Sequence, residues 1–195
     1  MEKLRREDLM SLERYAQERA AFRAEALAHK RLRTVALGLN MTLLFEDRVT
    51  VQYQVQEMLR IERVFEAAGI EDELGSYNPL IPDGSNLKAT CLIEFGDVDV
   101  RRRELERLTG IEHAIRAEVA GHGAAETHAD EDLERSTAEK TSAVHFLRFE
   151  FSRAQVDALR GGAALSFRVD DARYPESVVL DAATRAALLR DFDES

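Results

Sequence analysis

Residues 41–63 read Met41-Thr-Leu-Leu-Phe-Glu-Asp-Arg-Val-Thr-Val-Gln-Tyr-Gln-Val-Gln-Glu-Met-Leu-Arg-Ile-Glu-Arg63 and combine two periodicities. The first residues form a short apolar run. Together with Thr34–Leu37 this run flanks the turn residues Gly38-Leu-Asn40, which predicts a β-hairpin. From position 48 onward the apolar residues recur at helical spacing, so we expect a helix over 48–68, ended by Gly69 as its C-cap. This helix is apolar over most of its circumference, which predicts that it is buried.

Three polar side chains, Gln54, Glu57 and Glu62, fall on the apolar sides of this helix. A buried carboxylate is costly unless it is satisfied, and arginine is its natural partner. One interpretation, which we favour, is an ion-pair network that fixes packing. The other is a polar pocket for a small ligand, built on Glu57 and Arg60 beneath the segment that follows the helix. The candidate ligand-binding residues are Glu46, Arg48, Tyr53, Gln56, Glu57, Arg60, Glu62 and Tyr77.

The remaining sequence predicts an α+β fold: a mostly antiparallel sheet, with N-terminal helices, a β-hairpin and the long buried helix packed against it. We expect one domain over 1–195, with a helix, hairpin and helix part over 1–70, a connecting loop over 69–87 and a sheet-rich part over 88–195. The other expected helices are at 8–31, 98–108, 152–160 with Ser152 as N-cap, and from Asp181 onward. The expected strands are at 88–95, 111–120, 124–128, 141–151, 163–170 and 177–180.

The charge balance disfavours nucleic acid as a partner. Lys+Arg 27 against Asp+Glu 37 gives a net charge of −10, so the chain is acidic and is not expected to bind phosphate backbones non-specifically. The charged N-terminus and the lack of a long apolar run predict a cytoplasmic protein that does not enter membranes. A homo-oligomer is compatible with the sequence.

Alternation along three expected strands directs Cys91, His113 and His145 toward an apolar interior. If the strands are neighbours, a sulfur and two nitrogens could form a metal or redox site. The favoured alternative is three core residues, since a free cysteine is commonly buried. No phosphate-binding glycine loop or nucleophile elbow is present, and no cofactor is predicted.

The chain resembles a bacterial family known as a domain of unknown function. The resemblance rests on residues 35–38, 41–48, 53–60, 77–82 and 140–149, and it covers nearly the whole chain. Genes of this family are often found beside genes for rubrerythrin-like and iron–sulfur reductase-like proteins. The resemblance therefore implies a role near peroxide defence or electron transfer.

Two functions follow from these observations. The first, which we favour, is an accessory protein that binds a rubrerythrin-like or iron–sulfur partner. The second is an enzyme or sensor that uses either the Glu57 and Arg60 pocket or the set of Cys91, His113 and His145.

Overall fold

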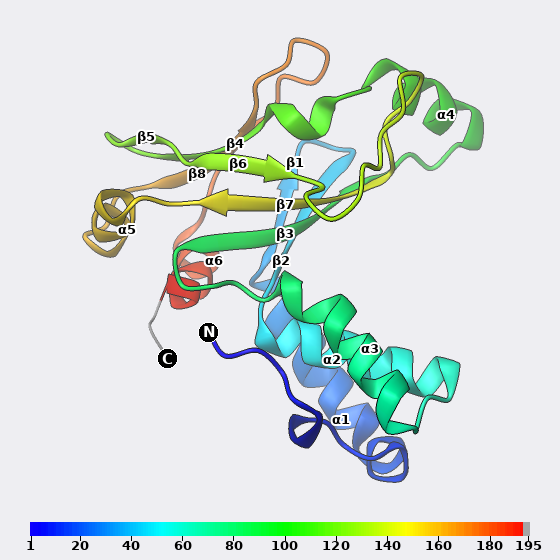
Figure 1. Cartoon of the computed structure of the whole chain (residues 1–195). Helices are drawn as coiled ribbons and strands as arrows, with labels where there is room; N and C mark the ends of the chain where they lie inside the picture. Colours follow the sequence, from blue (N-terminus) through cyan, green and yellow to red (C-terminus); the bar gives the residue numbers. More distant parts are fainter. Residues whose placement is uncertain (193–195) are drawn as a thin grey trace.

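The computed structural model describes residues 1–192 and has an α+β architecture, with a helical layer on one side of two antiparallel sheets (Figure 1). The α-helices are α1 (Leu12–Arg31), α2 (Arg48–Glu62), α3 (Ala67–Tyr77), α4 (Val98–Arg107), α5 (Arg153–Arg160) and α6 (Ala182–Leu189). Short 3-10 helices are η1 (Arg6–Asp8), η2 (Asn78–Leu80), η3 (Ile111–Ala114) and η4 (Arg190–Phe192). The end of the expected domain, residues 193–195, lies outside the described residues.

The first sheet has the order β1-β2-β3-β7-β6, and every neighbouring pair is antiparallel. Its strands are β1 (Thr34–Leu37), β2 (Met41–Glu46), β3 (Asn86–Ile93), β7 (Val144–Glu150) and β6 (Glu126–Ala129). β1 and β2 form the expected hairpin around Gly38, whose φ of 76° is one that glycine adopts at no steric cost.

The second sheet has the order β5-β4-β8-β9. Its strands are β5 (Gly123–Ala124), β4 (Ile115–Val119), β8 (Leu165–Val169) and β9 (Ser177–Val179). The sequence predicts a single sheet, whereas the structure divides the strands between two.

The main core lies between the inner faces of these sheets. Phe45 of β2, Phe149 of β7 and Phe167 of β8 meet there, with ring centroids 5.0–6.3 Å apart. Alternate residues of β2, β7 and β8 are buried, as in sheets that cover a core with one face. The C-terminal η4 closes one end of this core, because Phe192 packs edge-on against Phe151 at 5.1 Å.

A second apolar cluster holds the helical layer together. It consists of Leu4, Val51, Val55, Leu59, Leu74 and Ile81. Helix α2 starts directly after β2, with Asp47 as its N-cap: the Asp47 carboxylate accepts hydrogen bonds from the backbone N–H groups of Val49 and Thr50. The layer of α1, α2 and α3 is therefore connected to the first sheet at the end of β2 (Figure 1).

The predicted end of the central helix is wrong. Helix α2 ends at Glu62 because Arg63 adopts the left-handed conformation, with φ 57° and ψ 42°. Gly69 lies within α3 rather than at a cap. A Cβ on Gly69 would come within 2.6 Å of Val64 Cγ1, so glycine is required there for close packing.

The predicted loop over 69–87 is also wrong, because most of it is α3 and η2. The strand expected to begin at position 111 instead begins at 115, after the turn of η3. The predicted N-cap Ser152 is confirmed: its hydroxyl accepts a hydrogen bond from the backbone N–H of Gln155. None of the helices in residues 1–192 has the length and apolar character needed to cross a membrane.

Candidate functional site

The predicted Glu57 and Arg60 pocket is closed by partners from α1. Arg19 binds the Glu57 carboxylate bidentately at 2.7 and 2.8 Å, and the Tyr15 hydroxyl donates to it at 2.6 Å. Arg60 adds a further contact at 3.1 Å. The hydrogen bond from Arg19, the largest influence, lowers the pKa of Glu57 far below its usual range. This arrangement is a satisfied ion-pair network.

The other candidate residues on or near α2 do not converge on one site. Glu46 accepts hydrogen bonds from the hydroxyls of Thr50 and Thr90, and Arg48 forms an ion pair with Asp8 at 2.7 Å. Gln56 is fully buried, and its side chain binds the backbone of Met10.

Tyr53 and Glu62 have no common partner with these residues. The Tyr53 ring lies beside Phe22 at 6.2 Å and beneath the Lys30 ammonium at 5.5 Å. Glu62 is exposed, so its expected burial is wrong. The helix ends at this residue, which leaves its side chain outside the helical layer.

A cavity of about 930 Å³ lies beneath the segment 69–87, between that segment and the outer face of the first sheet. We call it the outer-sheet pocket. Of the predicted candidates, only Tyr77 lines it. Its lining residues are Met58, Glu73, Gly75, Ser76, Tyr77, Pro79, Leu80, Asp83, Asn86, Lys88, Ala89, Glu131, Asp132, Arg135, Phe146, Leu147, Arg148 and Glu150.

The cations of the outer-sheet pocket are already paired. Lys88 and Arg148 are cross-strand neighbours on β3 and β7. The Lys88 ammonium contacts Asp83 at 2.6 Å and donates to the carbonyl of Pro79 at 2.8 Å. Arg148 binds the Glu131 carboxylate bidentately, and it also contacts Glu150 at 2.6 Å.

The third cation, Arg135, forms a fork with the Asp132 carboxylate at 2.6 and 2.7 Å, and its guanidinium lies 4.5 Å from the centre of the Phe146 ring. Five carboxylates line the pocket against these three cations. The pocket is therefore negatively charged overall.

Glu73 is the carboxylate without a partner. Within residues 1–192 no cation or hydrogen-bond donor contacts its side chain. Burial, followed by the nearby charges of Glu62 and Asp72, raises the pKa of Glu73 above its ordinary value. A cation that entered the pocket would relieve this repulsion.

A second group of polar side chains lies between the two sheets and does not include all the predicted metal ligands. Cys91 and His145 are cross-strand partners on β3 and β7, as the alternation predicts. His113 instead points to solvent, with its side chain 70% exposed, because η3 interrupts the alternation there. Burial raises the pKa of the Cys91 thiol to about 12, so this sulfur is a poor ligand and nucleophile.

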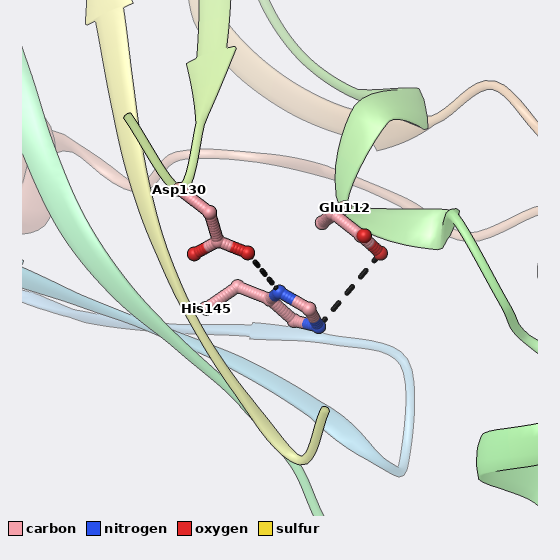
Figure 2. A group of neighbouring side chains, drawn as sticks. All are labelled: Glu112, Asp130 and His145. Carbon is pink, nitrogen blue, oxygen red and sulfur yellow. Dashed lines mark hydrogen bonds and ion pairs between the residues drawn. The ribbon is translucent and has the colours of Figure 1, made fainter. Parts of the chain in front are cut away.

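Glu112 and Asp130 take the positions around His145 that His113 was expected to share. Figure 2 shows the imidazole between the two carboxylates. Asp130 Oδ2 lies 2.6 Å from Nδ1, and Glu112 Oε2 lies 3.7 Å from Nε2. His145 is fully buried and Glu112 is 2% exposed. We call Glu112, Asp130, Ser136, Thr141 and His145 the buried polar network.

Two hydroxyl groups complete the buried polar network. The Thr141 hydroxyl donates to Glu112 Oε2 at 3.0 Å and lies 2.8 Å from His145 Nε2. The Ser136 hydroxyl donates to the other Glu112 oxygen. These bonds and burial act in opposite directions on the pKa of Glu112: burial raises it, and the Ser136 bond with the other contacts outweighs that effect and lowers it.

The sequence could have indicated part of both sites. Lys88 and Arg148 stand on the polar face of well-predicted strands, but their pairing depends on strand order, which one sequence does not show. Asp130 and Glu112 lie in turns without a periodic signal. No pattern in the sequence connects them with His145.

Comparison with known proteins identifies a family and a solved structure that are both described as of unknown function. A family model described as "Protein of unknown function (DUF3501)" matches residues 3–192. A crystal structure described as a novel protein of unknown function from Burkholderia pseudomallei K96243 shares 47% sequence identity, with a TM-score of 0.93 over 98% of this chain and 100% of that chain. No curated protein sequence matches the chain.

Proposed function

We propose that this chain, which belongs to the DUF3501 family of proteins of unknown function, binds a small organic cation in the outer-sheet pocket. The observation that carries the proposal is the cavity of about 930 Å³, which falls in the size range of small-molecule sites. The ligand class is an amine or guanidine with an apolar body.

The charge of the pocket supports a cationic ligand. Lys88, Arg135 and Arg148 are each held by carboxylates, so an anionic ligand would have to displace an existing ion pair. The unpartnered Glu73 offers a half-buried carboxylate to a cation. A new ion pair there would gain from partial removal of water.

The apolar lining supports a ligand with a hydrophobic body. Tyr77 and Leu80 line one wall of the pocket and Phe146 lines the sheet side. Aromatic and aliphatic surface of this kind supplies affinity, while a few polar groups set orientation.

The test is calorimetric titration with amines and guanidines that carry alkyl or aryl groups, with carboxylates of the same carbon skeleton as controls. Glu73→Gln should weaken binding of the amines about tenfold, because it removes one charge from a half-buried contact. The matched control is Glu71→Gln on the same helix, where the side chain is exposed. Binding of the carboxylates alone would contradict the proposal.

A second variant separates occupancy of the pocket from charge. Gly75 lines the pocket, and a Cβ built on it meets no atom within 4 Å. Gly75→Leu should therefore fold normally, place a side chain in the pocket and abolish binding. Unchanged affinity in this variant would show that the amines bind outside the outer-sheet pocket.

An accessory role beside a redox or peroxide-defence protein is the second candidate. Exposed apolar side chains at the end of α2 and just after it favour this role, since Ile61 is 61% exposed and Phe65 is 71% exposed. The prediction is that the chain captures a rubrerythrin-like or iron–sulfur protein from its native host, and that Phe65→Ser loses this capture. Purification as a free homo-oligomer, with no partner even after co-expression, would contradict it.

A further inference from the structure

We propose that the buried polar network binds one divalent first-row transition-metal ion, with His145 Nε2 and Glu112 Oε2 as its ligands. This site is separate from the outer-sheet pocket, and neither proposal depends on the other. The argument rests on the orientation of the imidazole, the convergence of donor atoms at Nε2 and the charge of the group.

Asp130 fixes the orientation of the imidazole. A carboxylate only accepts hydrogen bonds, so the contact of 2.6 Å to Nδ1 places a hydrogen on that nitrogen. Backbone contacts hold Asp130 in turn, because its other oxygen accepts from the N–H of Phe146 at 2.9 Å. Histidines that bind metal through Nε2 commonly donate Nδ1–H to such a carboxylate.

Oxygen atoms surround the other nitrogen. His145 Nε2 lies 2.8 Å from Thr141 Oγ1, 3.1 Å from the Ser142 carbonyl oxygen and 3.7 Å from Glu112 Oε2. Ligands at about 2.1 Å from an ion lie about 3.0 to 3.4 Å from their neighbours in octahedral or tetrahedral sites. The distance to Ser142 falls within this interval, the distance to Thr141 lies just below it and the distance to Glu112 just above it. Small shifts of these side chains would therefore place one nitrogen and three oxygens around a cation bound to Nε2.

The formal charge of the group favours a divalent ion over a proton. Glu112 and Asp130 are carboxylates, and a proton on Nε2 leaves the group with one net negative charge in a buried place. Arg135 reaches Asp130 at 3.2 Å, but its closer fork is with Asp132 at 2.6 Å. A divalent ion with a neutral imidazole brings the sum for Glu112, Asp130 and His145 to zero.

The ligand types indicate the class of ion. Imidazole suits zinc, iron, copper and nickel, while carboxylate and carbonyl oxygens suit harder ions. The mixture disfavours an ion that requires only oxygen, such as Ca²⁺. An ion that prefers sulfur ligands alone, such as Cu⁺, is disfavoured as well, because the atoms around Nε2 are oxygens. We therefore expect Zn²⁺, Mn²⁺ or Fe²⁺, with Co²⁺ as the spectroscopic substitute.

The experiment measures metal content and affinity of the full chain. The protein is purified after growth with Zn²⁺, Mn²⁺ or Fe²⁺ and analysed by elemental mass spectrometry, and the chelated protein is titrated with Co²⁺. We expect about one ion per chain and the absorption of Co²⁺ with nitrogen and oxygen ligands. Less than about a tenth of an ion per chain, with no Co²⁺ absorption, overturns the proposal.

Three variants locate the ion. Glu112→Gln keeps the shape of the side chain and should lose metal binding, while Asp130→Asn should weaken it by about 10- to 100-fold. His113→Gln is the matched control, because His113 is exposed and lies 3.8 Å from Glu112. If His113→Gln removes the ion and Glu112→Gln does not, the ion is on the surface and the proposal fails.

A second measurement tests the site in wild-type protein and does not depend on whether the variants fold. Wild-type protein should melt at a higher temperature with Zn²⁺ than with a chelator, since an ion that binds only the folded state stabilises it. This readout needs no variant. Equal melting temperatures in the two conditions contradict a buried site.

Discussion

The Glu57 side chain connects α2 to α1, because it accepts hydrogen bonds from Tyr15 and Arg19. Replacing the carboxylate with an amide removes the charge that Arg19 faces and leaves one acceptor oxygen where Arg19 and the Tyr15 hydroxyl now share two. We expect Glu57→Gln to lower the free energy of unfolding by about 2 kcal/mol. The measurement is urea denaturation, with Glu62→Gln at the exposed end of the same helix as the control, expected within about 0.5 kcal/mol of wild type.

The lowered pKa values of Glu57 and Asp83 predict how the stability of the fold responds to acid. Arg19 lowers the pKa of Glu57, and hydrogen bonds from Lys3 and Lys88 outweigh the effect of burial to hold the pKa of Asp83 at about 2. A carboxyl whose pKa is lower in the folded state stabilises the fold above its unfolded pKa, and this contribution disappears as the pH falls.

We therefore expect the urea midpoint to fall as the pH drops from about 4 to about 2, the interval between the ordinary pKa of Asp83, 3.8, and its folded value. Asp83→Asn should flatten this decline, because the variant has no carboxyl at that position to protonate. A decline of equal slope in both proteins would show that other groups dominate.

Arg33 connects elements that are far apart in the sequence. Its guanidinium, 2% exposed, donates to the carbonyls of Phe45, Glu46 and Ala187 and forms an ion pair with Asp191 at 2.5 Å. The sheet, the start of the helical layer and the C-terminal helix thus share one side chain. Burial raises the pKa of Asp191 to about 6 even with this partner, which indicates how little water reaches the junction.

We expect Arg33→Ala to cost about 3 to 5 kcal/mol, because it leaves a buried carboxylate and three carbonyls without their donor. The measurement is the denaturation midpoint in urea. Arg23→Ala, on an exposed face of α1, is the control. If Arg33→Ala does not fold, Arg33→Lys should still be less stable than wild type, since a single ammonium cannot reproduce the fork.

The elements that sequence predicts well are those with a strong local signal. The hairpin at Thr34–Leu37 and Met41–Glu46 follows from its turn residues, and the capped start of α5 follows from Ser152. The break after α2 has no such signal. Arg63 takes the left-handed conformation that glycine usually occupies, and tertiary packing of Gly69 on Val64 overrides the local pattern.

The sites are less predictable than the elements for the same reason. Arginine partners for Glu57 follow from its residue type, and Arg19 and Arg60 do bind it. The buried polar network joins a turn, a loop and a strand, and no periodicity relates them. Which residues meet across two sheets depends on strand order, and strand order follows from long-range packing.

The two apolar clusters raise the question of whether the sheets and the helical layer unfold together. Several polar contacts cross between them, among them Arg33 to Asp191 and Lys88 to the carbonyl of Pro79. We expect a single cooperative transition, with a calorimetric enthalpy equal to the van't Hoff enthalpy. A separate low-temperature transition, with loss of helical signal alone, would show two independent units.

Cys91 has a practical consequence that follows from its place between the sheets. It is the single cysteine of the chain and is fully buried, and its thiol stays protonated at neutral pH. An alkylating reagent reaches the sulfur only when the sheets separate. The rate of mass increase with iodoacetamide, at one increment per molecule and without denaturant, therefore times the spontaneous opening of the native protein.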